Sequence, residues 1–248
     1  MQRGKIYIGT SGWSYRDWPG IFYPDKMKST EWLTFYSKSF DVTEINSSFY
    51  HLPREKTVLG WVKKVPENFK FCPKISRYLT HMKKLHEPEE PLQRFFGVFK
   101  EIKHYLGPVL IQLPPSLRFD KEVAGHFFDL LKSDYARYDF VLEVRHKSWL
   151  EQDAIDLLTS YQIGFVISQS GAGFPYAEVI TSGIIYARFH GPGKLYFSSY
   201  SDEMLEEYAG KFRKWLKKGH NIWVFFNNTG QGIGIENAKT LEKLMRDK

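Results

Sequence analysis

The sequence has almost no cysteine. Cys72 is the single cysteine in 248 residues, so no disulfide can form within the chain. The sequence has no cluster of cysteine and histidine residues with the spacing of a zinc finger, which excludes a structural zinc site of that kind. Because disulfides are typical of secreted domains, we expect this protein to be cytoplasmic.

Long apolar runs are also missing. The longest, IWVFF at 222–226, is too short to span a bilayer, and the first residues, MQRGKIYIGT, lack the apolar core of a signal peptide. No glycine-rich pattern of the form GxGxxG or GxxxxGK[ST] follows a predicted strand. We therefore expect no membrane role, and the sequence predicts no cofactor.

The chain is instead rich in positive charge and in aromatic side chains. The formal net charge is +7, and the segment 54–104 holds 12 Lys and Arg against 6 Asp and Glu. Such a basic sector attracts phosphates and nucleic acid. Hydrophobic residues make up 42% of the chain and aromatic residues 17%, which is typical of a packed globular protein. The length suits one domain, 1–248.

Apolar segments alternate with segments of helical periodicity along the chain. Strands are predicted at 5–10, 41–47, 69–76, 109–113, from 140 onward, and at 164–168, 184–190 and 221–227. Segment 77–90 is predicted as a loop, and the glycines and prolines of 169–183 predict an irregular crossover after strand six. Eight strands alternating with helices predict an α/β protein with a (β/α)8 TIM-type barrel.

Strand five carries charges within an apolar segment. In FVLEVRHKSW, 140–149, side chains alternate between two faces, so Glu143 and Arg145 share one face and His146 lies on the other. Charges in a buried strand are costly unless they are paired or used. The pattern predicts either an ion pair that orients the strand or a site at its carboxyl end.

Polar side chains also stand at or just beyond the carboxyl ends of other predicted strands. They are Glu44, Asn46, Lys74, Gln112, Arg188, His190, Asn227 and Asn228. In a β/α barrel the carboxyl ends of all strands meet at one face, where the active sites of this fold lie. Each of these groups could instead be hydrogen-bonded by its own neighbours and have no function. Because so many strands end in polar residues, we consider that explanation weaker and predict a functional pocket.

Chemical roles follow from the types of side chain. Glu143 and His190 are predicted to transfer protons, with Glu44 as the second carboxylate of an acid and base pair. Lys74 is predicted either to hold an anion or to form a Schiff base. Together with Lys74, Arg145 and Arg188 suit a phosphate or carboxylate group, because guanidinium groups bind such oxygens in pairs.

The expected ligand is therefore small and anionic, either phosphate-bearing or derived from nucleic acid. Further substrate contacts are predicted from Asn46, Gln112, Asn227, Asn228, His146, Trp13, Tyr15, Tyr50 and Trp149. The aromatic residues in this set would either stack on a ring of the ligand or plug the barrel mouth. An enzyme of acid and base chemistry is the preferred function, and hydrolysis and isomerisation fit equally.

Two alternatives stay open. Glu44 and Glu143 together with His190 could hold a divalent cation and support phosphoester hydrolysis, but nearby cationic side chains would repel that ion, so no metal is predicted. The basic sector 54–104 could instead make the protein a nucleic-acid-binding module without catalysis.

Several motifs spread over nearly the whole chain resemble one known family. They are GTSGWSY at 9–15, FYP at 22–24, EINSSFYHLP at 44–53, LTH at 79–81, QLPPS at 112–116, EVRHKSW at 143–149, YARFHG at 186–191 and FNNTGQGIGIENA at 226–238. This combination resembles the domain of unknown function 72, also called the YecE-like family. The resemblance implies a β/α barrel with a pocket at the strand ends, and no established activity. Many members end strand six in an aspartate, where this sequence has Ser168 and Gln169, so no carboxylate role is carried over there.

Overall fold

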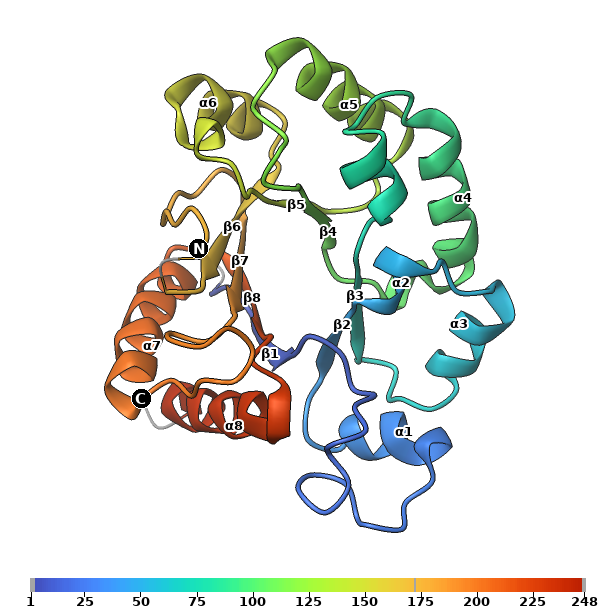
Figure 1. Ribbon diagram of the computed structural model, residues 1–248, viewed down its shortest axis with the longest axis vertical. Helices are drawn as coiled ribbons and strands as arrows, with labels where there is room; N and C mark the ends of the chain where they lie inside the picture. The colour runs from blue at the N-terminus through green and yellow to red at the C-terminus, as the bar shows by residue number, and fades with distance from the viewer. Residues whose placement is uncertain (1–2, 172, 247–248) are drawn as a thin grey trace.

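The computed structural model describes residues 3–171 and 173–246, and its strands form one ring of eight parallel neighbours (Figure 1). Their order is β3-β2-β1-β8-β7-β6-β5-β4. The strands are β1 (Ile6–Thr10), β2 (Val42–Ile45), β3 (Lys70–Pro73), β4 (Val109–Gln112), β5 (Phe140–Glu143), β6 (Gly164–Gln169), β7 (Ile184–Phe189) and β8 (Asn221–Phe226). The predicted strands all exist, and most are shorter than the sequence suggested.

β3 and β4 stand at the two ends of this strand order, and contacts between them close the ring. Isolated parallel bridges pair Phe71 with Leu106 and Lys74 with Leu110. The backbone N–H of Ile75 donates to the carbonyl of Leu110 at 2.9 Å. The predicted TIM-type (β/α)8 barrel is therefore confirmed.

Helices surround the ring on its outer side (Figure 1). They are α1 (Trp32–Tyr36), α2 (Ser47–Tyr50), α3 (Glu55–Val62), α4 (Glu89–Phe99), α5 (Lys121–Asp134), α6 (Gln152–Ser160), α7 (Asp202–Lys217) and α8 (Ile233–Arg246). Two have side-chain N-caps: Asp120 accepts from two N–H groups at the start of α5, and Ser201 accepts from Met204 at the start of α7. No helix in the described part of the chain is both long and apolar enough to cross a membrane.

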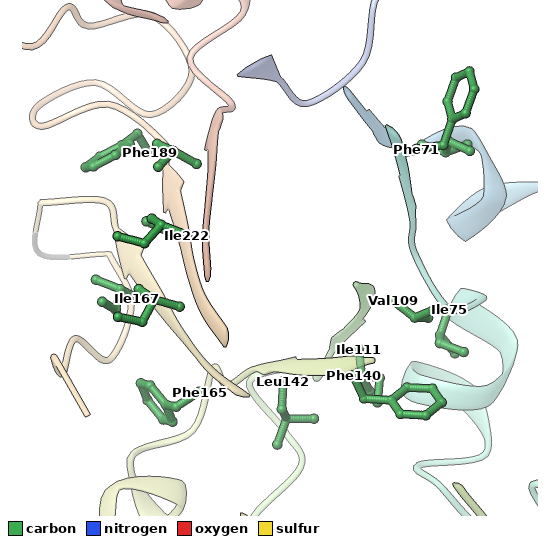
Figure 2. Packing of buried hydrophobic residues seen from close by; sticks show 14 of the residues in the cluster. Phe71, Ile75, Val109, Ile111, Phe140, Leu142, Phe165, Ile167, Phe189 and Ile222 are labelled. Carbon is green, nitrogen blue, oxygen red and sulfur yellow. The ribbon is translucent and has the colours of Figure 1, made fainter. Parts of the chain in front are cut away.

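Alternation along each strand separates the core from the site. Leu142, Ile167 and Phe189 lie on the outer side of the ring, toward the helices, and belong to the large core between strands and helices (Figure 2). A second cluster of buried residues fills the barrel interior: Val42, Cys72, Leu110, Val141, Val166, Tyr186, Trp223 and Phe225. Inward positions further along the same strands carry the polar residues, so an apolar plug lies beneath a charged layer.

The connections differ in how well the sequence predicted them. No helix occurs between β6 and β7 in the described residues 170–171 and 173–183, as the glycines and prolines indicated, and residue 172 lies outside the described part. The loop predicted at 77–90 was wrong in part, because Tyr78–Met82 forms a π-helical turn and α4 already begins at Glu89. The hydroxyl of Thr80 stabilises that turn by donating to the carbonyl of Ser76 at 3.1 Å.

Candidate active site at the strand ends

A cavity of about 520 Å³ opens at the carboxyl ends of the strands. Its walls are formed by Tyr15, Asn46, Phe49, Tyr50, Lys74, Arg77, His81, Gln112, Pro115, Arg145, Phe174, Arg188, His190, Tyr196 and Asn227. No carboxylate is present among these described lining residues, whereas four of them are Lys or Arg. The cavity is therefore a cationic chamber in the place where this fold carries its active sites.

Below the cavity lies a layer that we call the charged floor, formed by Glu44, Glu143 and Arg188. Both carboxylates are fully buried, and Arg188 is 1% exposed. Arg188 donates from Nε and Nη2 to the two oxygens of Glu44 at 2.8 and 2.9 Å, and from Nη1 to Glu143 at 2.6 Å. One guanidinium thus links β2, β5 and β7 through three charge-assisted hydrogen bonds.

Both carboxylate oxygens of Glu143 already accept hydrogen bonds from neighbouring side chains. Its Oε1 accepts from Arg145 Nη2 at 2.5 Å, from Ser168 Oγ at 2.8 Å and from His190 Nε2 at 3.2 Å. Burial alone would raise the pKa of Glu143, but the guanidinium groups of Arg145 and Arg188 hold that pKa well below its usual range. This carboxylate stays ionised and serves to fix the groups around it.

His190 is likewise engaged at both ring nitrogens. Because ionised Glu143 can only accept, Nε2 carries the proton, and Nδ1 then accepts from the amide of Asn227 at 2.9 Å. Burial lowers the pKa of His190 to about 4, despite the opposing hydrogen bond to Glu143. The imidazole is neutral at physiological pH and has no free lone pair.

One side of the cavity, which we call the reactive wall, consists of Lys74, Arg77 and His81. Lys74 follows β3 directly, and the hydroxyl of Ser48 holds its backbone by donating to its carbonyl at 2.8 Å and accepting from its N–H at 3.1 Å. Arg77 caps the start of the π-helical turn three residues later, and His81 lies within that turn. Strand end and turn thus bring three nitrogen-bearing side chains to one wall.

Lys74 is buried without a counter-charge. Its Nζ donates to Gln112 Oε1 at 2.8 Å and lies 3.9 Å from the ring centre of Phe49. Within the described chain no carboxylate lies within 4.0 Å of Nζ. Burial lowers the pKa of Lys74 to about 7, with repulsion from Arg188 as the next cause.

The tautomer of His81 depends on the direction of its hydrogen bond to Thr80. Thr80 Oγ1 lies 3.1 Å from the carbonyl of Ser76 and 2.9 Å from His81 Nδ1. In the tautomer in which Thr80 donates to Ser76 and Nδ1 donates to Thr80, the lone pair is on Nε2, which has no hydrogen-bond partner among the described residues. Burial, followed by the charges of Lys74 and Arg77, lowers the pKa of His81 to about 4. The imidazole is therefore a neutral base with a free nitrogen.

Arg145 forms the opposite part of the cavity. The carbon at the centre of its guanidinium lies 3.3 Å from the ring centre of Phe174, and its Nε is buried without a hydrogen-bond partner. Phe174 belongs to the irregular crossover after β6. An unused donor at the cavity wall is costly unless a ligand or water accepts from it.

Comparisons with known proteins agree with this architecture. The family model described as "Protein of unknown function DUF72" matches residues 7–248. The chain belongs to the DUF72 family.

Named relatives of this DUF72 protein are themselves uncharacterised. UPF0759 protein YunF of Bacillus subtilis is 26% identical over 97% of this chain and 94% of its own length. UPF0759 protein YecE of Escherichia coli K12 is 27% identical over 57% of this chain and 48% of its own length. A DUF72 family protein from Thermotoga maritima has a similar structure, with a TM-score of 0.84 and 28% identity, covering 97% of this chain and 99% of that one.

Most residues predicted for the site of this DUF72 protein line the cavity or the floor below it. Two of the predicted aromatic residues, Tyr15 and Tyr50, line the main cavity, and Tyr50 is 70% exposed at its mouth. Trp13 instead borders an adjoining cavity of about 240 Å³ and packs edge-on against Trp61 and Phe71.

Three predicted substrate contacts lie elsewhere, which corrects the sequence-based set. Trp149 is 1% exposed, and its Nε1 donates to the carbonyl of Leu117 at 3.0 Å. His146, on the outward face of its segment, accepts at Nδ1 from the backbone N–H of Ser148. The amide of Asn228 donates to the carbonyl of Ser198 and to Asn237. All three hold loops in place beside the cavity.

The sequence reasoning also missed several cavity residues. They are Phe49, Arg77, His81, Pro115, Phe174 and Tyr196. For Arg77 and His81 a signal existed, since both directly follow the strand that ends in Lys74, and LTH is one of the shared motifs. For Phe174 and Tyr196 none existed, because irregular segments have no periodicity from which to infer a direction.

The geometry also bears on a divalent cation. The guanidinium of Arg188 lies between Glu44 and Glu143, in the position that a bridging metal would need. Across residues 3–171 and 173–246, no group of three or more His, Cys, Asp or Glu side chains has an arrangement that could hold an ion. The two carboxylates are arranged to bind an arginine.

Proposed function

We propose that the strand-end cavity binds a small anionic, phosphate-bearing substrate and that the protein is an enzyme transferring protons on it. One observation carries the proposal: Lys74, Arg77 and Arg145 line one chamber, and no carboxylate is among its described lining residues. Guanidinium groups bind phosphate and carboxylate oxygens in pairs, and the unpartnered Nε of Arg145 offers a further donor.

Proton transfer is assigned to the reactive wall rather than to the floor. His81 has a free lone pair on a neutral ring, and Lys74, with its pKa near 7, exchanges a proton close to neutral pH. Glu143 and His190, which the sequence favoured for this task, have every relevant atom occupied by neighbours. We therefore assign to Glu143 and His190 the positioning of Arg145 and Arg188. Because proton transfer alone suffices for isomerisation, we rank isomerisation above hydrolysis.

The alternative of a nucleic-acid-binding module has less support. Several cations of the sector 54–104 form ion pairs inside that sector: Lys83 with Glu87, Arg94 with Glu90, and Lys100 with Glu101. Lys70 and Lys64 donate to backbone carbonyls. These side chains already have partners within the protein, so fewer of them are free to contact a polyanion, and a small ligand in the cavity is preferred.

Isothermal titration with inorganic phosphate tests the proposal. We expect millimolar or tighter binding by the intact protein and a loss of at least about tenfold in Arg77→Ala, which corresponds to about 1.4 kcal/mol. Arg54→Ala is the matched control, because Arg54 is exposed in the same basic sector and does not line the cavity. It should bind phosphate as the unmodified protein does.

Two results would count against the proposal. Equal weakening in Arg77→Ala and Arg54→Ala would place the anion on the outer surface. Tight binding of an unrelated DNA duplex with a steep salt dependence, unchanged in Arg77→Ala, would favour the nucleic-acid module. A parallel titration with Mg²⁺ tests the metal-dependent phosphoesterase, which requires binding of that ion by the intact protein.

A further inference from the structure

Lys74 differs from every other lysine in the described chain, because it alone is buried. Some of the more exposed lysines pair with carboxylates: Lys83 pairs with Glu87, and Lys211 pairs with two carboxylates. The Nζ of Lys74 instead has one neutral amide oxygen, an aromatic face and a cavity. Burial and the charge of Arg188 outweigh the stabilisation that this amide oxygen, the Phe49 ring and the more distant Glu143 and Glu44 give to a positive charge. The cavity gives a ligand access to the nitrogen.

We propose that Lys74 forms a Schiff base with the carbonyl carbon of the substrate, which makes that substrate an aldehyde or ketone carrying a phosphate or carboxylate group. The inference rests on the proposed function, since Arg77 and Arg145 supply the anion contacts that bring the carbonyl to Nζ. The amine nitrogen adds to the carbonyl carbon, the carbinolamine forms, and its oxygen leaves as water. No oxidant, reductant or metal is needed.

The protonation state of Lys74 suits this step. Only the neutral amine is nucleophilic, and at pH 7 an ordinary lysine with a pKa of about 10.4 is neutral in roughly one molecule in 2,500. Burial lowers the pKa of Lys74 to about 7, so about half of the molecules carry the free amine at that pH. The gain in reactive fraction is about a thousandfold.

His81 is placed to handle the protons. Both groups lie next to the Phe49 ring, whose centre is 3.9 Å from Lys74 Nζ and 5.1 Å from the centre of the His81 ring. Loss of water from the carbinolamine needs a proton delivered to the leaving oxygen, and the iminium so formed acidifies the neighbouring C–H bond. His81 Nε2, with its free lone pair, can accept the proton from that carbon and return it elsewhere on the substrate, which completes an isomerisation.

The backbone fixes the direction of the lysine. Ser48 holds the backbone of Lys74 by two hydrogen bonds, and the next residue, Ile75, donates to Leu110 across the closure of the barrel. Because the main chain is held on both sides, Nζ presents itself to the cavity without a large loss of rotamer freedom on reaction. This arrangement supports a covalent role for Lys74, in addition to the attraction of an anion by its charge.

Reductive trapping tests the inference. The full-length protein is incubated separately with dihydroxyacetone phosphate, glyceraldehyde 3-phosphate and pyruvate, reduced with sodium borohydride, and measured by intact mass and peptide mapping. We expect a single covalent adduct on Lys74 with at least one probe, formed faster as the pH rises through 7 and suppressed by inorganic phosphate. Lys74→Arg should give no adduct, and Lys56→Met, which removes an exposed lysine of the same basic sector, should label normally.

The outcomes separate this inference from the function on which it rests. Phosphate binding that depends on Arg77, with no adduct on Lys74 from any probe, would overturn the Schiff base and leave the anion site standing. Labelling spread over exposed lysines and unchanged in Lys74→Arg would also overturn it. An adduct on Lys74 that phosphate does not suppress would support the Schiff base and refute the proposed anion contacts. If the protein neither binds phosphate nor forms an adduct, both the anion site and the Schiff base are refuted.

Discussion

The charged floor and the reactive wall lie in the same barrel and use charge in opposite ways. In the floor, Glu44 and Glu143 are neutralised by Arg188 with additional hydrogen bonds, and nothing reaches solvent. On the wall, Lys74 and His81 have fewer hydrogen-bond partners than their nitrogens can bind. The comparison indicates a division of labour, in which the floor stabilises and positions while the wall keeps unsatisfied groups for a ligand.

The largest effect should come from removing the cation of the floor. Arg188→Met leaves Glu44 and Glu143 buried without their shared partner, and we expect a loss of about 3–5 kcal/mol in the free energy of unfolding. Urea denaturation followed by circular dichroism measures it. Arg77→Ala on the wall should change stability by no more than about 0.5 kcal/mol. Similar losses in the two variants would remove the distinction between floor and wall.

The next largest effect should be a dependence of stability on pH, caused by His190, which contacts the charged floor at Glu143. His190 has a folded pKa of about 4, below the value of about 6.5 in an unfolded chain, so the unfolded state binds more protons in that interval. Stability should therefore fall as the pH drops from about 6.5 to 4, by up to about 3 kcal/mol. His81, whose pKa is also about 4, contributes a fall of the same sign over this interval. His190→Gln should therefore make the fall smaller, and a curve unchanged by that substitution would contradict the assignment.

Glu143 adds a second phase at lower pH. Its folded pKa is depressed, so its stabilising contribution is present above the unfolded value of about 4.3 and is lost as the pH falls through the folded value. The two phases have the same sign, and only the first should become smaller in His190→Gln.

A smaller effect should follow from the edge of the floor. The hydroxyl of Tyr186 donates to Glu44 Oε1 at 2.8 Å from within the apolar plug. Tyr186→Phe removes a hydrogen bond to a charged group, and we expect a loss of about 1.5–3 kcal/mol in the free energy of unfolding. Thermal unfolding monitored by calorimetry tests this value. Phosphate binding should be unchanged, because the wall is untouched, and a parallel loss of binding would show that floor and wall act as one unit.

The sequence predicted the floor's members better than their pairing. Strand alternation correctly gave Glu143 and Arg145 one face, and the barrel rule correctly brought Glu44, Arg188 and His190 to the same end. Which cation would neutralise which carboxylate depends on distances across the barrel interior, and strand order alone does not supply them. The sequence therefore assigned proton transfer to Glu143, whose partners leave it no free oxygen.

The wall was predicted less completely for a different reason. Lys74 was identified because it ends a strand, but His81 and Arg77 lie on a π-helical turn in a segment predicted as a loop. Phe174 and Tyr196 come from segments whose paths depend on packing against the finished barrel. Local periodicity identifies residues on regular elements, and the cavity of a barrel is completed by residues that lie on none.

The sharpest contrast with the floor is expected for Lys74→Met, which should not lower stability. Burial makes the ammonium unfavourable, as the lowered pKa indicates, and methionine fills a similar volume against Phe49 without a charge. We expect the free energy of unfolding to stay level or to rise by up to about 1 kcal/mol, while adduct formation is abolished. Lys56→Met controls for general effects of removing a lysine. A loss of stability as large as that of Arg188→Met would mean that Lys74 belongs to the structural network, whereas a gain would show that this position retains a lysine at the expense of the fold.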